Sequence, residues 1–380
     1  MSDIIITDIK YRNTIPMIRH LAKQGHKIYC VEYDDVDPKQ CLGFYSKYCY
    51  KAFTIPDGDE LIPRLNELCA SLDHPILIAV GAKTLRNLVG KKIKAQVALP
   101  SLKALLEASD KNHVVSMAEK IGIPVPETFT LEHFSDLEEL ANVMAYPCII
   151  KYKNGELLSL KPSQRYRIIP DRQQFMDTYS EMHAKQENPL VQQYIEGDGY
   201  GVSLLIDADG DLCDFICHHR LREYPVTGGP SCFCETVFDR KLLQYSYRLL
   251  REMNFCGVAM VEYKGTLEAP YLMEINPRFW GSSPLIAVSQ SSFYDSLVQP
   301  RKIDVDTCAP SYKVGAKMRF TPQDFMAFSG YLKRESHKAK FFIQYVRSMF
   351  DFSVKDGIFS FSDMTPYFKY ISNAIRGSHS

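Results

Sequence analysis

The amino-acid sequence predicts an α/β region followed by an α+β region and a helical tail. In the first hundred residues, short apolar runs alternate with segments of helical periodicity, which is typical of parallel strand–helix–strand units. After about residue 200, strand-like segments follow one another with few helices between them, as in an antiparallel sheet. The last seventy residues are rich in Phe and Tyr, and a helix is predicted within them.

The N-terminal elements are predicted in chain order. Apolar runs at residues 4–9, 27–32 and 75–80 have the length of buried strands, whereas residues 14–23 and 61–72 have apolar side chains at helical spacing. Strands that alternate with helices form parallel sheets, so we predict a Rossmann-like domain. The Gly-x-Gly-x-x-Gly motif of dinucleotide sites does not follow the first strand, and NAD binding is therefore not expected.

The middle of the chain contains both kinds of element. Helices are predicted at residues 111–121, 134–144, 172–185 and 241–253. Strands are predicted at residues 146–152, 190–194, 201–207, 212–220, 257–263 and 271–275. The last two strands flank a loop and form a predicted hairpin.

The composition is that of a globular protein, with 46% hydrophobic and 24% charged residues. The net charge of zero gives no reason to expect nucleic acid as a partner. No apolar run reaches the roughly 18 residues of a membrane-spanning helix, and the N-terminus does not have the pattern of a signal peptide. Eleven cysteines, an odd number, favour reduced thiols. We therefore expect a cytoplasmic protein, and the sequence leaves its oligomeric state open, a homo-oligomer included.

The strongest chemical signal lies in the predicted hairpin. Glu274 and Asn276 point to one face of a strand because side chains alternate along it. Glu262 lies near the end of the neighbouring strand, so three oxygen ligands would converge. Such a set suits Mg²⁺, which accepts one or two carboxylates and takes its other ligands from phosphates and water. Arg278 could hold a phosphate oxygen through its forked guanidinium group.

This hairpin belongs to a longer pattern. The chain resembles ATP-grasp ligases, most of all their carbamoyl-phosphate synthetase and biotin carboxylase branch, in five motifs that follow the family's order. They are Asp110-Lys111, Tyr-Pro-Cys-Ile-Ile-Lys at 146–151, Leu-Val-Gln-Gln-Tyr-Ile-Glu-Gly at 190–197, the strand 258–262, and Leu-Met-Glu-Ile-Asn-Pro-Arg-Phe-Trp-Gly at 272–281. The resemblance runs from about residue 1 to residue 300, because the Rossmann-like region matches the domain that precedes the ATP-grasp domain in this family.

The resemblance implies three groups of site residues. ATP would be held by Lys111, Lys151, Gln192, Gln193, Tyr194 and Ile195, of which the last four form a hinge whose backbone recognises adenine. The metal, Mg²⁺ or Mn²⁺, would be held by Glu262, Glu274 and Asn276. The catalytic residues near the transferred phosphate would be Arg220 and Arg278.

Arg220 belongs to a polar segment that extends to about residue 231. Arg222 would share its role or bind a carboxylate, and Gly228 and Gly229 would let the backbone approach a ligand. The alternative is a charged strand end followed by a surface turn.

The chain departs from the family at two places. The stretch 153–161, which is glycine-rich in related enzymes and closes over the triphosphate, has only Gly155 here. Gln192 stands where related enzymes often have an acidic residue. Either departure would mean altered handling of phosphate or a lost activity, and the presence of Glu262, Glu274, Asn276 and Arg278 argues against loss.

A zinc site is the other hypothesis that the sequence raises. Four cysteines and a histidine occur close together, namely Cys213, Cys217, His219, Cys232 and Cys234. On a strand the first three would be spread apart along one face rather than close a tetrahedron. We therefore expect small buried cysteines of the core.

The resemblance also implies domains and a reaction. Residues 1–106 would be the Rossmann-like pre-ATP-grasp domain, 107–305 an ATP-grasp domain of two α+β subdomains, and 306–380 a C-terminal extension. The enzyme would use ATP to phosphorylate a small carboxylate substrate, and an amine or thiol would then displace phosphate, with ADP as the other product. The alternatives are a bicarbonate-activating enzyme of the carboxylase or carbamoyl-phosphate synthetase type, and an ATP-binding module without catalysis.

The tail is basic and aromatic. From residue 311 onward it has 11 Lys and Arg against 5 Asp and Glu, and 15 of the 45 aromatic residues. Residues 338–350 place Phe341, Phe342, Tyr345, Val346 and Met349 at helical spacing. Such a helix can lie on an anionic membrane as a peripheral contact, with exposed aromatic residues. The interpretation that we favour is that this face is buried against the preceding domain.

Overall fold

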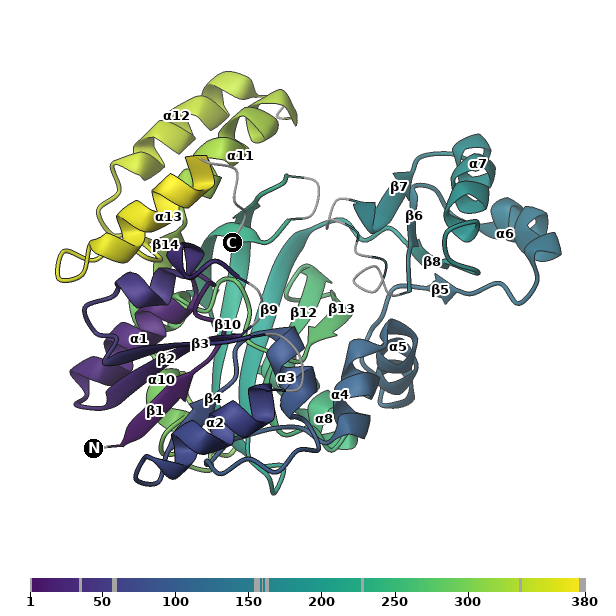
Figure 1. Cartoon of the computed structure of the whole chain (residues 1–380). Coiled ribbons are helices and arrows are strands. Elements are labelled where there is room, and N and C mark those ends of the chain that lie inside the picture. Colours follow the sequence, from purple (N-terminus) through teal and green to yellow (C-terminus); the bar gives the residue numbers. More distant parts are fainter. Residues whose placement is uncertain are drawn as a thin grey trace.

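The computed structural model describes residues 2–33, 36–56, 60–153, 158, 160, 164–226, 229–334 and 337–375. Within these ranges three β-sheets organise the chain (Figure 1). One is parallel and four-stranded, one has seven strands, and one is a small antiparallel sheet of four strands. The mixed α/β and α+β class predicted from the sequence is confirmed.

The N-terminal sheet is parallel, as predicted, in the order β3-β2-β1-β4. Its strands are β1 (Asp3–Ile6), β2 (Lys27–Tyr33), β3 (Lys51–Ile55) and β4 (Ile76–Ile78). The helices of this part are α1 (Thr14–Lys23), α2 (Leu61–Ala70), α3 (Ala82–Leu88) and the short 3₁₀ turns η1 (Pro38–Gln40) and η2 (Leu42–Tyr45). Ile4, Ile5 and Ile6 are fully buried, as a strand covered on both faces requires. The edge strand β3, whose residues are mostly exposed, was not predicted.

The central sheet has the order β13-β12-β9-β10-β11-β14-β15. Its strands are β9 (Asp198–Ile206), β10 (Leu212–Glu223), β11 (Ser231–Val237), β12 (Gly257–Gly265), β13 (Pro270–Asn276), β14 (Lys317–Arg319) and β15 (Lys355–Asp356). The helices α8 (Arg240–Glu252), α9 (Leu285–Val288) and α10 (Phe293–Ser296) belong to this part. Its buried side chains form one continuous cluster with those of β1 and α1, and Trp280 lies in that core.

The small sheet, in the order β5-β8-β6-β7, forms a lobe that projects from the rest of the molecule (Figure 1). Its elements are β5 (Thr128–Phe129), η3 (Phe134–Asp136), α6 (Leu137–Val143), β6 (Cys148–Lys151), β7 (Tyr166–Ile169), α7 (Arg172–His183) and β8 (Leu190–Gln193). The lobe has its own core, in which Phe175 and Tyr179 are fully buried. Two helices lead into it, α4 (Leu102–Ser109) and α5 (Lys111–Lys120).

The C-terminal extension contributes strands as well as the predicted helices. β14 pairs with β11, and β15 pairs in parallel with β14, so the extension completes one side of the central sheet. These strands have only three and two residues, which is too short for a periodic pattern. The helices are α11 (Thr321–Arg334), α12 (Lys338–Met349) and α13 (Thr365–Ile375). No helix in the described ranges is long and apolar enough to cross a membrane.

The end of the chain is fastened to its beginning. Arg19 of α1 forms an ion pair of 2.8 Å with Asp363, and the hydroxyl of Ser46 donates to the same carboxylate at 2.7 Å. Arg12, in the loop after β1, donates to the hydroxyl of Tyr370 on α13 at 2.7 Å. The extension therefore bridges the N-terminal and central sheets.

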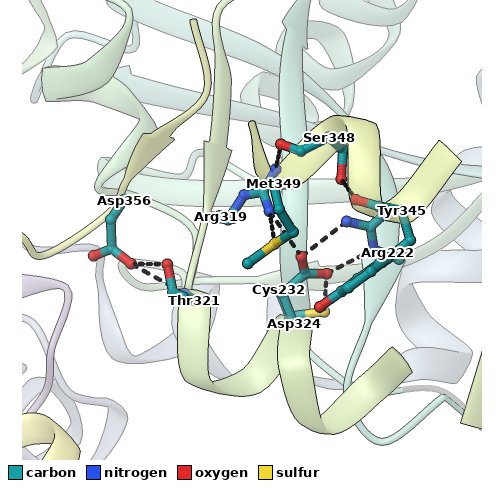
Figure 2. Close-up of polar contacts among 9 residues, drawn as sticks. All are labelled: Arg222, Cys232, Arg319, Thr321, Asp324, Tyr345, Ser348, Met349 and Asp356. Atoms are coloured by element: carbon teal, nitrogen blue, oxygen red, sulfur yellow. Dashed lines mark hydrogen bonds and ion pairs between the residues drawn. The ribbon is translucent and has the colours of Figure 1, made fainter. Parts of the chain in front are cut away.

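A buried ionic cluster joins the extension to the central sheet (Figure 2). Arg222 of β10 donates to both carboxylate oxygens of Asp324 on α11, at 2.6 and 2.8 Å. Arg319 of β14 lies 3.6 Å from the same carboxylate and also donates to the carbonyl of Ser348 on α12. The side chains of Arg222, Arg319 and Asp324 are 11%, 6% and 1% exposed. One carboxylate thus compensates two buried guanidinium groups.

We expect Asp324→Ala to lower the free energy of unfolding by about 3 kcal/mol or more, because it leaves Arg222 and Arg319 buried without their counter-ion. Urea unfolding monitored by circular dichroism measures the change. The matched control is Glu181→Ala, which removes the exposed Glu181–Lys185 pair and should cost less than about 0.5 kcal/mol. Equal losses in the two variants would contradict the role assigned to Asp324.

Candidate functional site

Two carboxylates and an amide meet on the β12–β13 hairpin. Glu262 and Glu274 are directly opposite each other in the ladder between the two strands. The side-chain amide of Asn276 donates to Glu262 at 3.1 Å and to Glu274 at 3.3 Å. The structure therefore brings together the three residues that the sequence proposed as metal ligands.

Two cations flank this pair. Lys111, the first residue of α5, forms an ion pair of 3.0 Å with Glu274, and Arg220 of β10 forms one of 3.0 Å with Glu262. Lys111 is placed by the cap of its helix, because the carboxylate of Asp110 accepts from the backbone N–H groups of Asn112 and His113.

The electrostatics of the two carboxylates differ. The positive charge of Lys111 lowers the pKa of Glu274 to about 2, and Glu274 in turn raises the pKa of Lys111. Burial raises the pKa of Glu262, although Arg220 opposes the change. The site therefore holds Glu274 firmly ionised, whereas Glu262 depends on its cationic partner.

Arg220 reaches Glu262 across the intervening strand β9. The residues of β9 at this point are Gly199, opposite Arg220, and Gly201, opposite Glu262. The Arg220 side chain lies over Gly199, where a Cβ atom would be 3.5 Å from two of its carbons. A Cβ atom at Gly201 would overlap the ring of His218. Gly199 thus lies in van der Waals contact with the Arg220 side chain, and Gly201 leaves room for the ring of His218.

Lys151 approaches the same site from the small lobe. It is the last residue of β6, and its ammonium group donates to the side-chain oxygen of Gln192 at 2.6 Å. Burial lowers the pKa of Lys151 to about 7, and the positive charge of Lys111 contributes in the same direction. The charge on Glu274 opposes this shift. Lys111 of α5 and Lys151 of β6 are therefore close enough to repel each other.

The segment after β8 connects the two sheets. Gln192 is 3% exposed and donates to the hydroxyl of Thr128, so its side chain links β8 to β6 and β5. The side-chain oxygen of Gln193 accepts from the backbone of Glu127 at 3.3 Å. Tyr194 and Ile195 follow β8 and lead into β9. The side chains of both glutamines are thus engaged within the lobe.

The crossing between the sheets depends on a close approach of two glycines. Gly197 has φ +120°, which only glycine adopts readily. A Cβ atom at Gly197 would lie 2.6 Å from the carbonyl oxygen of Gly265 at the end of β12. The hinge backbone is therefore packed directly against the strand that carries Glu262.

Arg278 is held at the end of β13. Its guanidinium group donates to the side-chain oxygen of Asn276 at 3.3 Å and to the carbonyl of Phe279 at 2.9 Å. It thus adjoins the Glu262–Glu274 pair through Asn276, as its place in the sequence suggested.

Sequence analysis missed two residues of the site, Lys264 and Glu223. Burial lowers the pKa of Lys264 and raises that of Glu223, and each acts on the other. Lys264 lies 5.1 Å from the ring centre of Tyr194, and Glu223 lies 3.7 Å from Arg220. Lys264 follows Glu262 by two residues on one strand, so side-chain alternation could have identified it.

The sequence offered two roles for Arg222, a place beside Arg220 or a carboxylate partner, and the structure shows the second. Alternation would place it beside Arg220, but the ladder between β10 and β11 is irregular between these residues. Such a bulge redirects side chains. Arg222 instead binds the carboxylate of Asp324, far along the chain, and has a structural role.

Gly229 packs against the backbone of Tyr224, whereas Gly228 and most of the stretch 153–161 lie outside the described residues.

The donors of the site fit a hard divalent cation and a polyphosphate. Glu262, Glu274 and Asn276 offer oxygen ligands, and two carboxylates leave coordination positions for phosphate and water. Lys111, Lys151, Arg220 and Arg278 supply the positive charge that a triphosphate requires. The cysteines considered for zinc, Cys213, Cys217, Cys232 and Cys234, are buried, as the sequence suggested.

Comparisons with known proteins agree with this geometry. Residues 108–282 match the family model of the ATP-grasp domain. Three solved structures share the fold. A complex of biotin carboxylase with β,γ-ATP from Campylobacter jejuni has a TM-score of 0.62 and 16% sequence identity, and the match covers 83% of this chain and 74% of that one. The biotin carboxylase domain of 2-oxoglutarate carboxylase from Hydrogenobacter thermophilus, with MgADP and bicarbonate, has a TM-score of 0.61 and 12% identity, over 83% of this chain and 73% of that one. N5-carboxyaminoimidazole synthetase from Staphylococcus aureus, with ADP, has a TM-score of 0.59 and 14% identity, over 80% of this chain and 78% of that one. The chain therefore carries, at residues 108–282, a segment that matches the ATP-grasp domain.

Proposed function

We propose that the protein is an ATP-dependent, ADP-forming ligase that joins a carboxylate to an amine or thiol. The observation that carries the proposal is the convergence of Glu262, Glu274 and Asn276 with cations from three separate elements. This arrangement lies within the segment that matches the ATP-grasp domain. We also propose domain boundaries near residues 106 and 305, which separate the parallel sheet, the ATP-grasp domain and the extension.

Each residue has a task in this reaction. Glu262, Glu274 and Asn276 would hold Mg²⁺ or Mn²⁺, which neutralises charge on the transferring phosphate. Lys111 and Lys151 would bind the phosphates of ATP, and the backbone of Gln192–Ile195 would receive the adenine. Arg220 and Arg278 would orient the γ-phosphate toward the substrate carboxylate. These groups position the reactants and stabilise charge, which is most of what phosphoryl transfer needs from a protein.

The chemistry then has two balanced steps. A carboxylate oxygen of the substrate attacks the γ-phosphorus of ATP, the bond to the β–γ bridging oxygen breaks, and ADP leaves. An amine or thiol next attacks the acyl carbon of the resulting acyl phosphate and displaces phosphate. The nucleophile loses its proton in this second step.

Bicarbonate is the second candidate substrate. The solved structures of similar fold include carboxylase components, and one of them was determined with bicarbonate bound. A small carboxylate and bicarbonate would make the same contacts with Arg278 and Arg220 in the first step. The two candidates therefore differ in the acceptor and not in the phosphate chemistry.

A coupled assay for ADP release tests the proposal. We expect release to depend on one class of organic carboxylate when amino acids, peptides and sugar acids are screened with an amine present. Release that needs only bicarbonate would establish the second candidate. Binding of ATP without acceptor-dependent release across the panel would identify an ATP-binding module instead.

Glu274→Gln should lower kcat about 100-fold or more and abolish the dependence of the rate on Mg²⁺ concentration, because an amide is a poorer ligand for a hard cation. Steady-state kinetics at several Mg²⁺ concentrations measure both effects. Glu268→Gln, on the exposed turn of the same hairpin, is the matched control and should leave kcat unchanged. Full turnover in the Glu274→Gln variant would remove the residue from the site.

ATP affinity should fall as the pH rises above about 7. In the free protein the pKa of Lys151 is lowered to about 7, so at pH 8 its side chain is mostly neutral. Bound phosphates would raise this pKa, and Lys151 would therefore take up a proton when ATP binds at pH 8. Affinity would then be constant at lower pH and fall up to about tenfold per pH unit above 7. Calorimetry with Mg²⁺ and a non-hydrolysable ATP analogue, in buffers of different ionisation enthalpy, measures the uptake.

Lys151→Arg is the control for this measurement, because an arginine stays charged throughout the range. The variant should bind the analogue with no proton uptake at pH 8. A slope as steep in the variant as in the original protein would show that another group titrates.

A further inference from the structure

The exposed apolar side chains of the molecule are concentrated on the C-terminal extension. Within the described ranges, eleven of the nineteen large hydrophobic side chains that are exposed lie between residues 325 and 368. They are Phe325, Met326, Phe342, Ile343, Val346, Met349, Phe350, Phe352, Phe361, Met364 and Phe368. Phe350 is 73% exposed and Phe352 is 88% exposed. Single exposed hydrophobic residues are common on proteins, but a concentration in one part of the chain marks an interaction surface.

Helix α12 shows how these side chains are arranged. Phe341 and Tyr345 form its inner face, where both pack against Phe328 of α11, with ring centres 6.0 and 4.5 Å apart. Tyr345 is buried, as was expected from the sequence, and Phe341 is half-buried. The expectation is wrong for the remainder, because Val346 is exposed and Phe342, although its ring centre also lies 6.0 Å from that of Phe328, is 51% exposed.

The exposed residues of α12 form one stripe. Phe342, Ile343, Val346, Met349 and Phe350 are separated by one, three or four positions, the spacing of neighbours on one side of a helix. A third face of the helix carries the exposed Lys340 and Arg347, seven residues apart. An apolar stripe beside a basic one is the pattern of a helix that lies in a membrane interface.

The charge of the extension is arranged to suit an anionic partner. Among the described residues of the extension, seven Lys and Arg residues are exposed, namely Lys313, Lys333, Arg334, Lys338, Lys340, Arg347 and Lys355. Two of its five acidic residues, Asp324 and Asp363, are buried against arginines and add little negative charge to the surface. Among the described residues, Lys338, Lys340 and Arg347 have no ion pair. The extension therefore presents uncompensated positive charge next to exposed apolar side chains.

We propose that the exposed apolar stripe of α12, with the basic residues beside it, binds the surface of an anionic membrane. The apolar side chains enter the boundary between headgroups and acyl chains, and the lysines and arginines contact the headgroups. This proposal does not depend on the ligase activity.

A second copy of the chain is a less suitable occupant. Two such faces brought together would place Lys340 and Arg347 of each copy near those of the other, and like charges in contact oppose association. An anionic lipid surface instead offers charge complementary to both residues and an apolar layer for Phe342 and Phe350.

Sedimentation of the full-length protein with vesicles tests the proposal. We expect binding to phosphatidylcholine vesicles that contain about 30% phosphatidylserine, weak binding to phosphatidylcholine alone, and loss of binding as salt screens the charges. Phe342→Ser combined with Phe350→Ser, and separately Lys338→Glu combined with Lys340→Glu, should each weaken binding about tenfold or more.

Matched controls lie elsewhere on the surface. Leu102→Ser with Leu106→Ser removes two exposed apolar residues from α4, and Lys91→Glu with Lys92→Glu reverses two exposed charges after α3. Both should bind like the original protein. The proposal is overturned if the protein stays in the supernatant with anionic vesicles at low salt, or if the control pairs lose as much binding as the α12 pairs. It is also overturned if light scattering shows a dimer that Phe342→Ser with Phe350→Ser dissociates, since a second copy would then cover this face.

Discussion

The site depends on one electrostatic constraint, the juxtaposition of Glu262 and Glu274 on adjacent strands. Like charges directly opposite each other destabilise a sheet, and burial increases the cost. The fold compensates them with Lys111 at 3.0 Å from Glu274 and Arg220 at 3.0 Å from Glu262. This requirement explains why Lys111 stands at the start of α5 and why Arg220 extends over Gly199 of β9 to reach Glu262. The arrangement of helix, hairpin and sheet follows from keeping two carboxylates side by side.

Two of the cations around the Glu262–Glu274 pair repel each other. These are Lys111 of α5 and Lys151 of β6, and their repulsion contributes to the low pKa of Lys151. A polyanion placed between them would relieve the repulsion and let Lys151 remain charged. Because the small lobe has a core of its own and joins the central sheet through the hinge at Gly197, it can respond to such a ligand without disturbing the central core. The protein alone is electrostatically incomplete at this position, as a binding site for a polyphosphate and a metal should be.

The sequence predicted the long elements and the order of motifs well, because both rest on local patterns. The strands around Ile4–Ile6 and the β12–β13 hairpin have clear periodicity, and the hairpin alone implied that Glu262, Glu274 and Asn276 would meet. Contacts between residues that are far apart in the sequence could not be predicted. The partner of Arg222 is Asp324, 102 residues away, and the bulge that separates Arg222 from Arg220 has no signature in composition or spacing. The two short strands of the extension depend on pairing with the central sheet, because β14 pairs with β11 and β15 then pairs with β14.

The same long-range contacts connect the two surfaces proposed here. β14 pairs with β11, and Arg319 of β14 donates to the carbonyl of Ser348 on α12. The Arg222–Asp324 pair joins α11 to β10, the strand that also carries Arg220. The extension and the central sheet are therefore joined by a buried ionic cluster and a continuous β ladder, both of which resist hinge motion. A membrane bound at the outer face of α12 would accordingly fix the orientation of the β12–β13 hairpin relative to the lipid surface, whereas the small lobe, attached through the Gly197 hinge, would stay free to close. Membrane binding and nucleotide binding would thus use different elements, α12 for the first and the β12–β13 hairpin for the second, so neither needs to displace the other.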